Sequence, residues 1–146
     1  MLWISVFSTD VLANEELSRE EILQQRMAYY IHFGEFLVPW YYLAAIDQYE
    51  RNIQSVRSDI PKRDSVIAIQ FSEEYWNGPL NSTDGDSPAS DISYFGGVGL
   101  DGNGDGIADR NNDEDIIYTM ASYLSQFGLE EENFKLALYE YYYTEE

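Results

Sequence analysis

The sequence lacks cysteine and has a single histidine among its 146 residues. Without cysteine, the chain cannot form a disulfide scaffold, a cysteine-ligated zinc site or a thiol nucleophile. Basic residues are also scarce: eight Lys and Arg stand against 27 Asp and Glu, which gives a formal net charge of −19. A surface this negative repels phosphate backbones and anionic lipid headgroups. We therefore expect no nucleic-acid partner and no binding to membrane surfaces.

Apolar residues, in contrast, are plentiful. With 45% hydrophobic and 16% aromatic residues, a chain of this length can bury the core of one domain. The acidity is uneven, because residues 1–63 carry a net charge of −3 whereas residues 64–146 carry −16. The second part must either tolerate strong self-repulsion or bind a cation.

The chain divides into a short apolar start and one domain. Residues 1–13 are too few to span a bilayer, and Val11-Leu12-Ala13 resembles a signal-peptide cleavage site. We interpret residues 1–13 as the remnant of an export signal, with an ordinary helix turn or strand as the alternative. Residues 14–146 are then the domain.

The spacing of apolar residues predicts a mainly α domain with a small β or irregular insert. Ser18 and Glu21 have the spacing of a capping box, so a helix begins there and runs to about Phe33, where Gly34 ends it. The expected buried stripe of this helix consists of Ile22, Leu23, Met27, Tyr30 and Ile31.

Further helices are predicted from Pro39 to about Ser55, from about 113 to 127, and from about 130 onward. Residues 66–71 are typical of a short strand or a buried segment. Residues 77–112 form a long loop region rich in Gly, Asn, Asp, Ser and Pro. A loop of this length within a small domain is usually functional.

The acidic loop from residue 101 onward has the ligand spacing of a calcium site. It places oxygen-bearing side chains at positions 1, 3, 5 and 9 of an EF-hand loop, with Gly106 at the glycine position. Asn112 stands where that motif has its bidentate Glu, and a loop longer by three residues would use Asp115 instead. The expected ligands are the side chains of Asp101, Asn103, Asp105, Asp109 and Asp115 and the backbone carbonyl of Ile107. The alternative is a solvated acidic turn.

Glu50 is a carboxylate on an otherwise apolar helix face. It shares that face with Leu43 and Ile46, and Asp47 is three residues away. Partial burial and a like-charged neighbour both favour a protonated carboxyl, which is what protonation of a glycosidic oxygen requires. The alternative is a solvated Glu50, or one paired with Arg51 or Arg57.

Two stretches resemble the lytic transglycosylases of the lysozyme-like superfamily. The segment from Val38-Pro39 to Glu50 is similar to their catalytic helix, which starts with Val-Pro and ends on the catalytic Glu. The loop from Gly99 to Asp109, continued to Asp115, is similar to their lengthened calcium loop.

Two looser similarities extend the resemblance to about residues 18–143. Ala68-Ile69-Gln70 resembles the Gly-Leu-Met-Gln segment that lines the cleft in this family. The stretch Ala137 to Tyr142 resembles an Ala-x-x-x-Tyr-Asn motif, with Tyr141 at the tyrosine and Tyr142 in place of asparagine.

The resemblance implies a lysozyme-like fold, a structural calcium ion and peptidoglycan glycan strands as the partner. It implies cleavage of the β-1,4 bond between N-acetylmuramic acid and N-acetylglucosamine, with Glu50 as acid and then base and with Gln70 and Tyr141 in the cleft. Two further residues are predicted from their own positions. Asp47 is the nearest second carboxylate by helix spacing, and Trp76 is either a stacking platform for a sugar or simply core.

A closer likeness is to the lysozyme-like module that precedes a metallopeptidase domain in cell-wall enzymes of Gram-positive, spore-forming bacteria. It implies secretion to the cell wall or spore envelope, and a downstream peptidase domain that is not in this chain. The alternative function is therefore a non-catalytic, calcium-stabilised wall-binding module of a larger peptidase, and a third is a calcium-dependent interaction domain. The basic stretch Arg51 to Arg63 either meets carboxylates of peptide stems on a glycan or balances nearby acids.

Overall fold

The computed structural model describes residues 16–81 and 87–144. The interpreted export remnant, residues 1–13, lies outside the described residues. Within them, the chain forms six helices and two short strands. Their order is α1 (Arg19–Gly34), α2 (Trp40–Val56), α3 (Glu73–Asn77), β1 (Ser87–Pro88), α4 (Ala89–Tyr94), β2 (Ile107–Ala108), α5 (Asp113–Ser125) and α6 (Glu131–Thr144).

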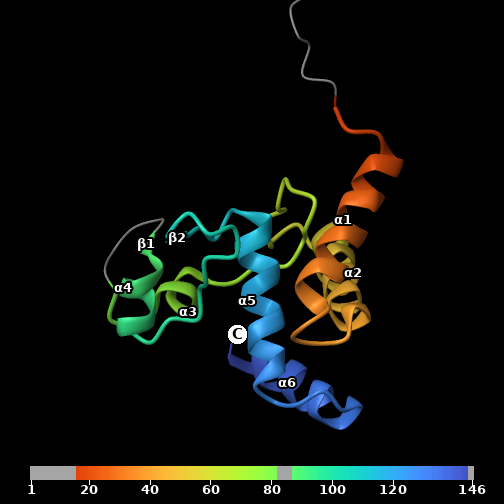
Figure 1. The fold of residues 1–146 in the computed structure, drawn as a ribbon. Helices are drawn as coiled ribbons and strands as arrows, with labels where there is room; N and C mark the ends of the chain where they lie inside the picture. The colour runs from red at the N-terminus through yellow and green to blue at the C-terminus, as the bar shows by residue number, and fades with distance from the viewer. Residues whose placement is uncertain (1–15, 82–86, 145–146) are drawn as a thin grey trace, which may run out of the picture.

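Helix α5 is the centre of the fold. Helices α1 and α2 pack against each other and against α5, and α6 contacts α5 at the bottom of the view in Figure 1. The short elements α3, α4, β1 and β2 gather on the other side of α5 (Figure 1). Because α5 has neighbours on several sides, it buries side chains almost all around. Those with at most 2% exposure include Ile116, Ile117, Met120, Ala121 and Leu124.

Helix α1 begins as predicted. The capping box is confirmed, because the Ser18 N–H donates to Glu21 Oε2 at 2.7 Å and the Glu21 N–H donates to Ser18 Oγ at 3.3 Å. These two bonds satisfy backbone donors that the first turn of a helix leaves without partners.

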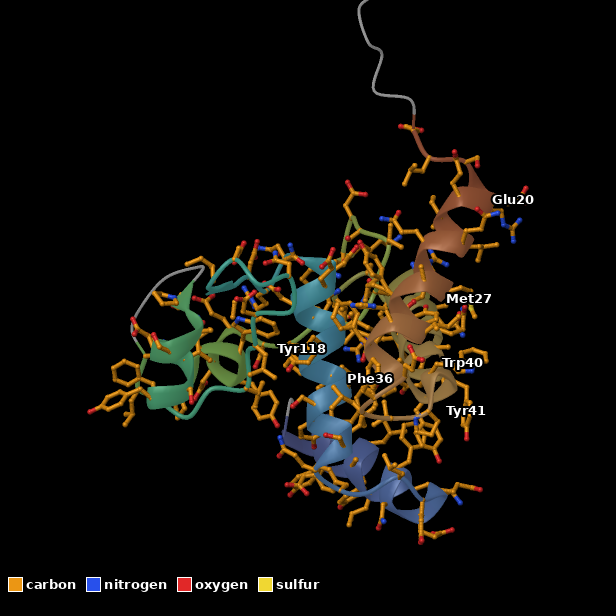
Figure 2. All side chains as sticks on the ribbon, in the orientation of Figure 1. Glu20, Met27, Phe36, Trp40, Tyr41 and Tyr118 are labelled. Atoms are coloured by element: carbon orange, nitrogen blue, oxygen red, sulfur yellow. The ribbon has the colours of Figure 1, made fainter. Side chains whose placement is uncertain are left out.

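The buried face of α1, however, is not the predicted stripe. Tyr30 is buried and Ile22 half-buried, but Leu23, Met27 and Ile31 are 48%, 38% and 48% exposed, so the prediction is wrong for these three. Figure 2 shows Met27 on the side of α1 that faces away from α5.

Polar contacts explain this orientation of α1. Arg26 Nε donates to the Val66 carbonyl at 2.9 Å, and the Tyr30 hydroxyl donates to Asp47 Oδ2. Phe33 packs near Tyr118 of α5, with ring centroids 6.0 Å apart. The inward face of α1 therefore combines aromatic and polar groups, which a count of apolar positions does not detect.

Helix α2 lies within about a residue of its predicted bounds. Its predicted face is confirmed, since Leu43, Ile46 and Gln54 are buried and Glu50 is half-buried. The following residues 66–71 form a largely buried segment that belongs to no helix or strand. The Gln54 side chain holds this segment, because its Nε2 donates to the Ala68 carbonyl at 2.6 Å.

The region predicted as one long loop, residues 77–112, contains more structure than expected. It includes α4 and an antiparallel pair of strands, in which Ser87 faces Ala108 and Pro88 faces Ile107. The short strands and the single turn-and-a-half of α4 are too brief to give a periodic signal.

The class is mainly helical with a small two-stranded sheet, which confirms the mainly α prediction with a small β insert. The lysozyme-like assignment remains a prediction. None of the helices in the described residues combines the length and apolarity needed to cross a membrane.

Candidate active site

A cleft of about 770 Å³ opens between the C-terminal half of α2, the segment that follows it and the end of α6. Three of the predicted site residues line it together: Glu50, Gln70 and Tyr141. They come from positions up to 91 residues apart in the chain, so the fold assembles them. Among the described residues that line this cleft, Glu50 carries the only carboxylate.

Glu50 is half-buried and is held by an aromatic hydroxyl from α6. Tyr142 donates to Glu50 Oε1 at 2.8 Å, and the Tyr142 ring lies edge-on to Tyr49, with centroids 5.2 Å apart. Burial, and then the negative charge of Glu50, raise the pKa of Tyr142. Tyr142 therefore remains a protonated donor and fixes the carboxylate of Glu50 at the cleft wall.

Gln70 and Tyr141 are part of the cleft wall, but both also have structural partners. Gln70 Nε2 donates to the Pro61 carbonyl at 2.8 Å. The Tyr141 hydroxyl donates to the Gln70 carbonyl, and Tyr141 as a whole is only 2% exposed. Tyr141 thus positions the segment around Gln70 and presents little surface to a ligand.

Asp47 does not reach the cleft, so it does not serve as a second catalytic carboxylate. It is 1% exposed. Its carboxylate accepts hydrogen bonds from the Tyr30 hydroxyl and the Ala68 N–H, and from Arg51 at 2.8 Å. A buried carboxylate with these partners ties α1, α2 and the 66–71 segment together.

Arg51 belongs to the same buried network. Besides Asp47, its Nη2 contacts the Val66 carbonyl at 2.9 Å. The structure therefore does not show the alternative in which Arg51 pairs with Glu50, because the Arg51 guanidinium contacts Asp47 and the Val66 carbonyl instead.

Trp76 is core rather than a sugar platform. It is 1% exposed, and its indole N–H donates to the Ala108 carbonyl at 3.1 Å. Gly99 lies directly against the ring, since a Cβ at that position would come within 2.5 Å of Trp76 Cε2. The side chain comes from α3 and reaches the backbone of β2, so it presents no open ring face to a sugar.

The sequence reasoning missed Tyr142, Arg110 and Phe71 as residues of the cleft. The sequence identifies Tyr142 only as a departure from a family asparagine. Its bond to Glu50 joins residues 92 positions apart. Local spacing carries no signal for such a contact.

The predicted calcium loop has tight glycine turns around Asp101. Asp101 accepts backbone N–H bonds from Gly104 and Gly106, both at 2.6 Å, and these glycines have the positive φ angles of 81° and 88°. In the described residues, no three acidic, histidine or cysteine side chains lie close enough to hold a metal ion. The oxygen donors suit a hard cation, and calcium binding by this loop stays a prediction.

Asp115 is the buried end of this loop. It is fully buried and accepts backbone N–H bonds from Gly102 at 2.7 Å, Asn103 at 3.2 Å and Asp109 at 2.8 Å. Burial raises the pKa of Asp115 and the charge of Asp101 raises it further, whereas the three N–H bonds lower it. Asp115 thus closes the loop onto the start of α5.

The fold and the cleft together define a mainly helical domain with one half-buried, tyrosine-bound glutamate in its cleft. No protein-family model matches the sequence, and no solved structure matches it significantly. Among curated proteins, the chain is similar to an L-Ala–D-Glu endopeptidase of Bacillus subtilis (strain 168), with 39% identity over 143 residues. The match covers 97% of this chain but 44% of that relative, so the chain spans less than half of the relative's length.

Proposed function

We propose that this chain is a peptidoglycan-cleaving domain of the lytic transglycosylase type, with Glu50 as its acid and base. The observation that carries the proposal is the position of Glu50, half-buried in a cleft and held by Tyr142. A carboxyl held in a partly desolvated cleft is suited to transfer a proton to a bound glycosidic oxygen.

The reaction needs only one carboxylate. Glu50 donates its proton to the oxygen that links N-acetylmuramic acid to the next sugar, and the C1–O bond breaks with its electron pair on that oxygen. The 6-hydroxyl of the muramic acid then bonds to C1 and returns its proton to Glu50. Hydrolysing glycosidases generally use two carboxylates, and the burial of Asp47 favours the single-carboxylate route here.

A second function is favoured by the named relative. An L-Ala–D-Glu bond occurs in the peptides of peptidoglycan, so the relative supports peptidoglycan as the partner without supporting cleavage of the glycan. In this alternative the chain is a wall-binding module of a larger peptidase. Under either function we propose secretion to the cell wall or the spore envelope.

Digestion of purified peptidoglycan distinguishes the two functions. We expect the wild type to release anhydro-muropeptides, detected by mass spectrometry, and Glu50→Gln to lower the rate at least about 100-fold. Glu20→Gln is the matched control, because Glu20 is an exposed glutamate of α1 that does not line the cleft. Binding to peptidoglycan without any cleavage would contradict the enzyme and support the wall-binding module. Release of products with intact reducing ends would contradict the 6-hydroxyl mechanism.

We also propose that the loop from Asp101 to Asp115 binds calcium, which offsets part of the charge that accumulates there. At a calcium concentration of 100 times its Kd, bound calcium raises the free energy of unfolding by about 2.7 kcal/mol, which corresponds to roughly 5–10 °C in Tm. Thermal unfolding with and without calcium measures the shift. Asp105→Asn should reduce it, whereas Asp91→Asn, an exposed aspartate of α4, should not. An unchanged Tm of the wild type at millimolar calcium would contradict the site.

A further inference from the structure

The cleft around Glu50 continues into a second depression. This neighbouring depression, of about 440 Å³, shares Gln70, Phe71 and Arg110 with the cleft. Its other wall is the segment that contains Lys62 and Arg63. A ligand longer than the Glu50 cleft would therefore run onto a surface built by the residues after α2.

Basic residues are concentrated along these two depressions. Four of the eight Lys and Arg of the chain line them: Arg57, Lys62, Arg63 and Arg110. The carboxylates that line them are Glu50 and Asp64. Half of the chain's cations therefore lie along these two depressions, although the chain as a whole has a net charge of −19.

Arg63 is a structural residue of this group. Its side chain is 9% exposed, and Nη1 contacts Asp113 Oδ1 at 2.6 Å and the Ile67 carbonyl at 2.7 Å. The pair anchors the segment after α2 to the first turn of α5. The charge of Arg63 is therefore already neutralised by Asp113 within the fold.

The other three cations present their charge to solvent. Lys62 is exposed, and no ion pair of Lys62 occurs in the part of the chain that is described. Arg110 is 37% exposed and lies 3.5 Å from Glu73, and Arg57 pairs with Asp59 while more than half of its side chain is exposed. Exposed pairs of this kind contribute little to stability, so an anionic ligand can replace one partner at low cost.

We infer that Lys62 and Arg110 bind carboxylates of the ligand, so that the cleft prefers glycan strands that still carry their acidic peptides. This inference rests on the proposed function, since it assumes that the glycan lies in the Glu50 cleft. The remaining surface repels an anionic ligand, and a local cluster of cations then both attracts and orients it. A peptide attached beside the sugar at Glu50 would extend into the neighbouring depression.

The test compares binding to peptidoglycan with binding to the same material after its peptide carboxylates are converted to neutral amides. Binding is measured by co-sedimentation of the wild-type protein at low salt. Two exposed cation–carboxylate contacts predict about fivefold tighter binding to the unmodified material, and this preference should weaken as salt screens the charges. In the variant Lys62→Ala/Arg110→Ala, both materials should bind equally.

The matched control is Arg19→Ala/Lys135→Ala, which removes the same charge at exposed helix positions outside both depressions. It should keep the preference. Because Arg110 also donates to the Phe71 carbonyl at 3.2 Å, Lys62→Glu is a second variant that leaves this bond intact and should reduce the preference as well.

Three results would overturn the inference. Equal binding of the wild type to both materials overturns it and leaves the proposed function standing. A preference that survives in Lys62→Ala/Arg110→Ala and in Lys62→Glu overturns the assignment to these residues. A wild type that binds neither material overturns the proposed function itself.

Discussion

Helix α2 carries two carboxylates less than one turn apart, and each accepts a hydrogen bond from a tyrosine. On one side, Asp47 is 1% exposed and accepts from Tyr30 of α1, the Ala68 N–H and Arg51. On the other side, Glu50 is half-buried in a cleft and accepts from Tyr142 of α6.

The difference separates a structural carboxylate from a candidate catalytic one. The Asp47 side joins three segments of the chain through a network of charged and polar bonds, and no ligand can reach it. The Glu50 side has the same chemical group and the same kind of donor, but it borders open space. Asp47 and Glu50 are therefore similar in residue type and lie on the same helix, and only their tertiary neighbours decide the role of each.

The largest expected difference between the two sides is in stability. Asp47→Asn leaves the half-buried Arg51 without its charged partner and should lower the free energy of unfolding by about 3 kcal/mol. Glu50→Gln keeps an acceptor for Tyr142 at a cleft wall and should change the free energy of unfolding by less than about 0.5 kcal/mol. Urea denaturation followed by circular dichroism measures both. Equal losses for the two variants would contradict the division of roles.

The local features on which this comparison depends could be predicted from the sequence. The face of α2 with Leu43, Ile46 and Glu50 follows from helical periodicity, and the capping box of α1 follows from a local pattern. Both depend on residues within one or two turns of each other. That is why they could be predicted without knowing the fold.

The parts that could not be predicted depend on contacts between distant segments. Asp47 looks like a second cleft carboxylate until Tyr30 and the Ala68 N–H are placed around it. The sequence leaves open whether Trp76 is a sugar platform or core, and only the contacts with Gly99 and the Ala108 carbonyl decide for core. Tyr142 becomes relevant only when α6 packs against α2.

The next largest difference is expected between the two tyrosines, because loss of the Tyr30 hydroxyl should affect stability and loss of the Tyr142 hydroxyl should affect mainly activity. Tyr30→Phe removes a buried hydrogen bond to a charged group and should cost about 2 kcal/mol of stability, without changing the cleavage rate per folded molecule. Tyr142→Phe leaves a carboxylate that water can still solvate and should cost about 1 kcal/mol. It should lower the cleavage rate about tenfold, because Glu50 loses its orientation.

Unfolding curves and initial rates of anhydro-muropeptide release, taken on the same samples, test this pair. Tyr139→Phe is the matched control, since this α6 side chain is 68% exposed. A lowered cleavage rate in Tyr30→Phe would show that the Asp47 side also contributes to activity, and an unchanged rate in Tyr142→Phe would remove Tyr142 from the site.

The smallest effect is expected in the dependence of stability on alkaline pH. Burial, as the largest cause, raises the pKa of Tyr30, Tyr123 and Tyr142 above the ordinary tyrosine value. Above about pH 10, the unfolded chain therefore releases protons that the folded protein keeps, and stability falls as pH rises. Each such tyrosine contributes a slope of about 1.4 kcal/mol per pH unit. Tyr30→Phe and Tyr142→Phe should each reduce the slope by this amount, and Tyr139→Phe should not. If only Tyr30→Phe reduces it, Tyr142 ionises in the folded protein, and the Glu50 side is more open to water than its hydrogen bond indicates.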